Sequence, residues 1–115
     1  VKTFMDERGW NTQPPEDIAK SIIIEAAELL EHFQWTKDQG HSPADDPKVL
    51  KEIIDELADV FVYATEMAIV LNVDVDEIVA DKLKRAAEKY PADKIKGKLG
   101  SQEYQKIKRD YRKKK

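Results

Sequence analysis

Carboxylate side chains recur at helical spacing in two apolar stretches of the sequence, residues 21–35 and 52–63. Glu25 and Glu28 stand three residues apart in the first stretch, which places them about 60° apart on one side of a helix. In the second stretch Glu56 and Asp59 have the same spacing and belong to a longer acidic stripe with the period i, i+3, i+4, i+7. Acids that line apolar helix faces in this way predict a site for a hard cation, because such ions prefer carboxylate oxygens.

The apolar residues beside these acids predict the core faces of the two helices. They are Ile22, Ala26, Leu29, Leu30 and Phe33 in the first stretch, and Ile53, Ile54, Leu57, Val60 and Phe61 in the second.

A solvated acidic face is the alternative interpretation of the carboxylates. Ordinary solvated helices interleave Lys with Glu at i, i+4, whereas the segment 52–81 contains nine acidic residues and no basic one. Apolar residues surround Glu25 and Glu28, so we expect both to be at least half buried. A buried carboxylate without a partner is destabilising by several kcal/mol, and a divalent cation is the simplest remedy.

The acidic pairs belong to an ordered set of motifs. E-x-x-E-L at 25–29 is followed by F-Q-W at 33–35, and E-L-A-D-V at 56–60 is followed by Tyr63. R-G-W at 8–10 precedes this set, and a Lys82 to Tyr-Pro segment follows it. Over roughly residues 4–92 the set resembles the all-α nucleoside triphosphate pyrophosphohydrolases, the MazG-like and dCTP pyrophosphatase group.

The resemblance implies a fold, a reaction and a set of functional residues. The fold would be all-α and of the four-helix-bundle type, in a homodimer or a dimer of dimers. The reaction would be hydrolysis of a (deoxy)nucleoside triphosphate to monophosphate and pyrophosphate, in nucleotide-pool housecleaning. The expected catalytic and metal-binding residues are Glu25, Glu28, Glu56 and Asp59. The expected substrate-binding residues are Trp10, Trp35, Tyr63, Lys82, Arg85 and Lys89.

The donor types and two departures from the family pattern refine this expectation. An all-oxygen donor set favours Mg²⁺, with Mn²⁺ as the alternative, over iron or zinc. Ala86 stands where related enzymes tend to carry Asn, and Lys89 stands where they carry Arg. Arg85 is the residue that could compensate on the phosphate side.

Aromatic residues and His32 have two interpretations each. Aromatic residues at helical spacing more often belong to the core than to a ligand site. From the residues alone both interpretations stand for Trp10 and Trp35, and the resemblance implies that they bind the base. His32 follows Glu28 by four residues and could ligate a metal, but a packed histidine is the favoured interpretation.

Charge divides the chain near residue 82. Residues 1–81 carry a net charge of −13, and residues 82–115 carry +10. We expect a catalytic helical domain over 1–92 and a basic C-terminal extension with a short helix over 93–115. A solubilising end or an oligomer contact is favoured for this extension over nucleic-acid binding.

Composition limits the class of protein. A length of 115 residues indicates a single small domain. The absence of cysteine excludes disulfides, Cys zinc sites and thiol nucleophiles. Nothing resembles a signal peptide or an apolar span of about 18 residues, so a cytoplasmic protein is expected.

Helix signals predict four helices after the N-terminal segment, at about 15–35, 47–71, 75–89 and 101–112. Pro15 and Pro47 are expected at first helical positions, with Asp46 as an N-cap. Residues 37–46 are predicted to form a polar loop, and residues 92–100 a linker.

Two other functions compete with this hypothesis. The first is a non-catalytic helical interaction module whose acidic stripe contacts a basic partner. The second is a related hydrolase of phosphoribosyl-ATP, against which the paired tryptophans argue.

Overall fold

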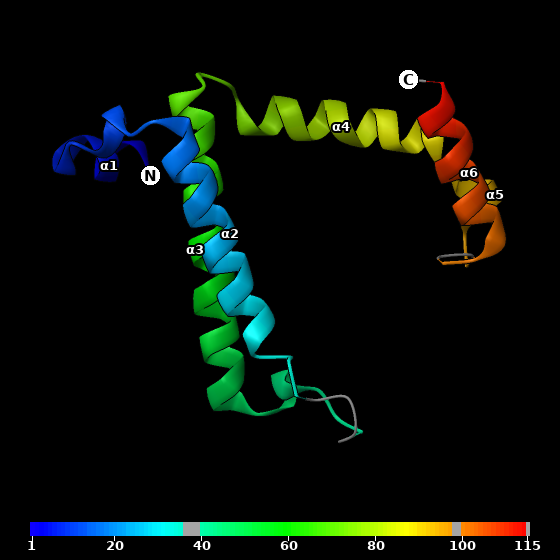
Figure 1. Ribbon diagram of the computed structural model, residues 1–115, viewed down its shortest axis with the longest axis horizontal. Helices are drawn as coiled ribbons and strands as arrows, with labels where there is room; N and C mark the ends of the chain where they lie inside the picture. Colours follow the sequence, from blue (N-terminus) through cyan, green and yellow to red (C-terminus); the bar gives the residue numbers. More distant parts are fainter. Residues whose placement is uncertain (36–39, 98–99, 115) are drawn as a thin grey trace. The chain divides into compact units, whose positions relative to one another are not determined.

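The computed structural model describes residues 1–35, 40–97 and 100–114, and every regular element in these ranges is helical (Figure 1). The elements are α1 (Lys2–Arg8), η1 (Trp10–Thr12), α2 (Pro15–Glu31), η2 (Pro43–Asp45), α3 (Pro47–Val70), α4 (Val75–Lys89), α5 (Ala92–Ile95) and α6 (Gln102–Lys113). The all-α prediction is confirmed.

Contacts divide the chain into two compact units, Val1–Asp74 and Val75–Lys115. The functional division into 1–92 and 93–115 stays a prediction. Among the described residues, no helix is both long enough and apolar enough to cross a membrane.

Helices α2 and α3 run antiparallel, side by side, and form the framework of the first unit (Figure 1). Pro15 occupies the first turn of α2, where its missing N–H has no intrahelical role. Glu16 and Asp17 follow in the same turn, where their negative charges interact favourably with the positive N-terminal end of the helix dipole. These signals fix where α2 begins and therefore which of its residues face α3.

Both ends of α3 are defined by local hydrogen bonds. Asp46 caps the start, its carboxylate accepting a 2.9 Å hydrogen bond from the backbone N–H of Lys48. At the other end Asn72 adopts a left-handed conformation, with φ of 55°. The N–H groups of Asn72 and Val73 then donate to the carbonyls of Ile69 and Ala68, which is the Schellman arrangement. The predicted Asp46–Pro47 start is confirmed.

The core of the first unit is small and lies where α1, α2 and the second half of α3 meet. Met5 and Ile18 are fully buried there, and Ala68 is nearly so. Apolar side chains that the sequence predicted as core remain open to solvent in a single chain, among them Leu30 at 68%, Ile54 at 54% and Phe61 at 65% exposure. These side chains stay exposed because α2 and α3 each cover only one face of the other helix.

Two predicted boundaries are wrong. Helix α2 ends at Glu31 rather than at Trp35, and the following residues form turns in which Phe33 N–H donates to Leu30 and Gln34 N–H to Glu31. Such i to i+3 hydrogen bonds close the end of a helix. The predicted linker contains the short helix α5, which begins after Pro91. Residues 36–39 of the predicted polar loop lie outside the described residues.

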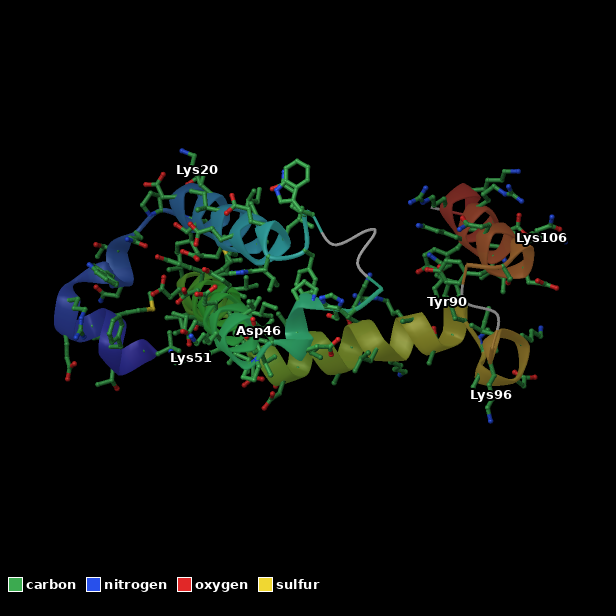
Figure 2. All side chains as sticks on the ribbon, turned by 90° about the horizontal axis from the view of Figure 1, so that it is seen from below. Lys20, Asp46, Lys51, Tyr90, Lys96 and Lys106 are labelled. Atoms are coloured by element: carbon green, nitrogen blue, oxygen red, sulfur yellow. The ribbon has the colours of Figure 1, made fainter. Side chains whose placement is uncertain are left out.

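In the second unit, α4 and α6 are joined by aromatic contacts. The rings of Tyr90 and Tyr104 stack with their centroids 5.0 Å apart and their planes 14° apart. Figure 2 labels Tyr90 where α4 ends, beside α6. Ser101 caps α6 by accepting a hydrogen bond from the N–H of Tyr104.

Candidate metal site

Four carboxylates meet between the middle of α2 and the middle of α3. Glu25 and Glu28 come from α2, and Glu56 and Asp59 come from α3. Oxygens of Glu25, Glu56 and Asp59 all lie within 4.8 Å of one another. We call the four residues the carboxylate cluster.

Glu28 links the two helices within this cluster. Its carboxyl group lies close enough to those of Glu25 and Glu56 to raise the pKa of both. One oxygen of Glu25, Oε2, is buried without a hydrogen-bond partner. Without a cation the cluster therefore leaves a buried acceptor unsatisfied.

Crowding of negative charge alters the acidity of the cluster. Burial raises the pKa of Glu25 to about 7, assisted by the hydrogen bond to Glu28 and by the charges of Glu28, Asp59 and Glu56. Burial also raises the pKa of Glu56, with Glu28 and Asp59 acting in the same direction and His32 opposing them. Both shifts have the sign expected where acids face one another without a cation.

The donor set fits a small divalent ion. Mg²⁺ holds oxygens at about 2.1 Å, so two oxygens on the same ion lie at most about 4.2 Å apart. The oxygens of Glu25, Glu56 and Asp59 lie up to 4.8 Å apart, which is slightly more than this limit. Attraction to a bound cation would draw them closer together. Such an ion would also satisfy Glu25 Oε2 and displace the proton that Glu25, with its raised pKa, holds near neutral pH. Carboxylate oxygens from two rigid helices can therefore hold a hard cation here.

His32 lies at the edge of the cluster, just after the end of α2. Its Nδ1 is 3.8 Å from a Glu52 oxygen and its Nε2 is 3.9 Å from a Glu56 oxygen. The His32 side chain is only 19% exposed. The ring thus contacts α3, as the favoured interpretation of a packed histidine predicted.

The three aromatic candidates differ in their surroundings. Tyr63 is partly buried one turn beyond Asp59, and burial followed by the charges of Glu25, Glu66 and Asp59 raises the pKa of its phenol. Trp10 lies in η1 and meets the ring of Phe4 edge to face at 5.6 Å. Trp35 is 80% exposed. Among the described residues, no hydrogen bond or ring contact joins Trp10 or Trp35 to the cluster.

The basic candidates belong to the second unit. Lys82, Arg85 and Lys89 all lie on α4, and the Arg85 guanidinium is paired with Asp81 one turn earlier. Their contact with a substrate held by the first unit stays a prediction.

Glu66 is a buried acid that the sequence analysis did not single out. It lies on α3 one turn beyond Tyr63, and it is 1% exposed. Its Oε2 has no hydrogen-bond partner, and burial raises its pKa. The sequence holds one hint of this burial, because Glu66 stands among the apolar residues Ala64, Met67 and Ala68.

Comparisons with known proteins agree with the motifs. Residues 20–107 match the model of the MazG-like family. Mouse dCTP pyrophosphatase 1 is 31% identical to this chain over 96 residues, which are 82% of the chain. The match covers 56% of the mouse protein, so the chain spans little more than half the length of that relative.

Proposed function

Because the chain belongs to the MazG-like family, we propose that it is a divalent-metal-dependent nucleoside triphosphate pyrophosphohydrolase. It converts a (deoxy)nucleoside triphosphate into the monophosphate and pyrophosphate, and so removes unwanted nucleotides from the cytoplasmic pool. The activity named for the mouse relative supports this class of reaction. The observation that carries the proposal is the convergence of Glu25, Glu56 and Asp59 inside the segment that matches the family.

The carboxylate cluster holds the cation in this proposal, with Mg²⁺ preferred and Mn²⁺ as the alternative. A bound divalent cation supplies charge neutralisation for the phosphates and makes water more acidic. Helices α2 and α3 fix the four carboxylates at the ends of short side chains, which limits the reorganisation that binding requires. Glu28 neighbours both Glu25 and Glu56, so it would join them in holding the ion.

The aromatic and basic candidates would bind the remainder of the nucleotide. Trp10 and Trp35 offer exposed ring faces on which a base can stack, a contact that contributes about 1–3 kcal/mol in nucleic-acid complexes. Tyr63 lies close enough to the cluster to hydrogen-bond a ligand or a carboxylate there. Lys82, Arg85 and Lys89 would contact the phosphates.

The test is an assay that separates pyrophosphate from orthophosphate. Canonical and modified nucleoside triphosphates and phosphoribosyl-ATP are incubated with the full chain in Mg²⁺, in Mn²⁺ and in EDTA. We expect pyrophosphate as the first product, and only with metal. Glu56→Gln should abolish its release while the circular dichroism spectrum stays helical, whereas Asp55→Asn, an exposed change on the same helix, should not. Orthophosphate as the first product, or full activity in EDTA, would refute the proposal.

We also propose that copies of this chain associate, as a homodimer or a dimer of dimers. The exposed apolar side chains of α2 and α3 support this, because a large unpaired apolar surface is unusual on a monomeric protein. Pairing of two α2–α3 hairpins would produce the predicted four-helix bundle and bury Leu30, Ile54 and Phe61.

A further inference from the structure

A cavity in the second unit brings four cationic side chains together. It has a volume of about 280 Å³, and its basic lining residues are Lys82, Arg85, Lys89 and Arg112. The first three come from α4, and Arg112 comes from the last turn of α6. Ala86, Tyr90 and Tyr111 complete the lining, which contains no acidic residue. We call this the α4–α6 cavity.

Aromatic contacts give this cavity defined walls. The stacked pair of Tyr90 and Tyr104 holds α6 against the end of α4. The Lys89 ammonium lies 4.4 Å from the centre of the Tyr111 ring and 5.0 Å from that of Tyr90, close enough for cation–π attraction to both. Residues from both helices are therefore held in place before any ligand arrives.

The positive charge of the cavity is only partly neutralised by the protein. Asp81 pairs with Arg85, whereas in the described part of the chain no carboxylate lies within ion-pair distance of Lys82, Lys89 or Arg112. The C-terminal ends of α4 and α6 are both near, and each contributes roughly half a negative charge. A net charge of about +2 remains.

The behaviour of Tyr90 agrees with this excess. Partial burial opposes ionisation of its phenol, but hydrogen bonds from Lys89 and Tyr104 and the charges of Lys89 and Lys108 outweigh it, and the pKa of Tyr90 is lowered. An anion is thus favoured at this end of α4.

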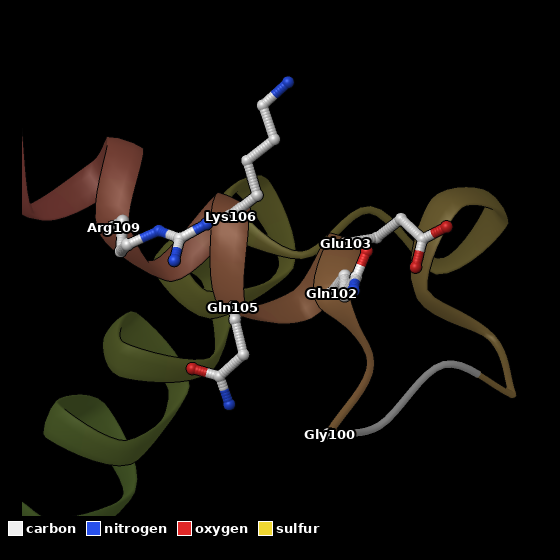
Figure 3. Close-up of a pocket in the computed structure, with 6 residues that line it drawn as sticks. All are labelled: Gly100, Gln102, Glu103, Gln105, Lys106 and Arg109. Atoms are coloured by element: carbon white, nitrogen blue, oxygen red, sulfur yellow. The ribbon is translucent and has the colours of Figure 1, made fainter.

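Other cavities of the second unit lack this character. Figure 3 shows one of about 570 Å³ along α6, where the side chains of Glu103, Gln105 and Lys106 extend in different directions. Two further cavities contain acids as well as bases, with Asp110 in both.

In the proposed function Lys82, Arg85 and Lys89 contact the phosphates, and we infer that the C-terminal helix α6 takes part in binding the same phosphate chain in the α4–α6 cavity, through Arg112 and Tyr111. A cavity of about 280 Å³ with two uncompensated charges suits a compact, multiply charged anion better than an extended nucleic-acid backbone, which would need a continuous basic stripe. Arg112 and Ala86 both line this cavity. The basic C-terminal segment then contributes to recognition of substrate.

This inference rests on the proposed function, because that function identifies the phosphates as those of a nucleotide substrate. The first test therefore measures binding alone, without hydrolysis. Inorganic tripolyphosphate is titrated into the full chain in EDTA by isothermal calorimetry. We expect saturable binding that Arg112→Gln weakens about tenfold, the effect of losing one charge-assisted hydrogen bond. Arg109→Gln is the matched control, because Arg109 lies on the same helix but lines the cavity of Figure 3; it should change affinity by less than about twofold.

If Arg112→Gln and Arg109→Gln reduce the affinity for tripolyphosphate equally, or if binding does not saturate, the inference is wrong and the attraction is diffuse. In hydrolysis assays, Arg112→Gln should raise KM and leave kcat nearly unchanged. An unaltered KM would show that the cavity does not bind the phosphates of the substrate. Binding that depends on Arg112 in a protein that hydrolyses no nucleotide would refute the proposed function and leave the cavity assignment intact. Tighter binding of a single-stranded oligonucleotide, weakened alike by both variants, would instead identify the segment as a nucleic-acid contact.

Discussion

Metal binding to the carboxylate cluster should release protons in an amount that depends on pH. A carboxyl group with a pKa of about 7 is half protonated at pH 7, and a metal ion binds only its ionised form. Glu25 alone then contributes about 0.9 proton per ion at pH 6, about 0.5 at pH 7 and about 0.1 at pH 8. The pKa of Glu56 is also raised, so its proton release acts in the same direction.

Calorimetry in paired buffers measures this number directly. Mn²⁺ is titrated into the metal-free chain at pH 6, 7 and 8 in buffers that differ in ionisation enthalpy. The slope of the observed enthalpy against the buffer enthalpy gives the protons released. The slope should fall by at least half between pH 6 and pH 8.

Two variants separate the cluster from general charge effects. Glu25→Gln should weaken Mn²⁺ binding and lower the slope at pH 6. Asp55→Asn removes the same formal charge from an exposed ion pair with Lys51 and should leave the slope unchanged. A slope near zero at pH 6 in the unmodified protein, together with firm Mn²⁺ binding, would refute the raised pKa of Glu25 as part of the metal site.

Three further predictions concern stability and assembly. Because the pKa of Glu25 rises from 4.5 in the unfolded chain to about 7 in the fold, the folded state binds more protons, and the melting temperature of the metal-free protein should fall as pH rises from 4.5 to 7. Mn²⁺ should reduce this fall in a thermal melt. Glu66→Gln should raise the free energy of unfolding at pH 8 by about 1–3 kcal/mol, measured by urea denaturation; the gain should vanish below pH 4.5, where the carboxyl is neutral in both states. Phe61→Glu places a charge at an exposed apolar position of α3 and should lower the molar mass measured by light scattering to that of a single chain. An unchanged mass would argue against this face as the interface.

The convergence of the acids was predictable because it depends on local periodicity. Glu25 and Glu28 share one side of a helix by spacing alone, as do Glu56 and Asp59, and the polar loop between the helices makes them antiparallel neighbours. The start of α3 was equally predictable, since Asp46 and Pro47 act on adjacent backbone groups.

Features that depend on long-range contacts were not predictable in this way. Glu66 is buried on α3, and no spacing rule separates this acid from the exposed acids of the same helix. The cavity beside Ala86 requires α6 to fold back on α4 through the rings of Tyr90 and Tyr104. The end of α2 at Glu31 was missed because the apolar pattern continues to Trp35, whereas i to i+3 hydrogen bonds close the helix earlier.

The small core of the first unit has a consequence for working concentrations. Among the described residues the large side chains that are fully buried are Met5, Ile18 and Glu66, and one of these is an acid. An isolated copy therefore has little to hold it together, and its melting temperature should climb as the sample becomes more concentrated. Dilution to nanomolar levels would then act as a mild denaturant, so rates measured there and at micromolar levels would describe different species.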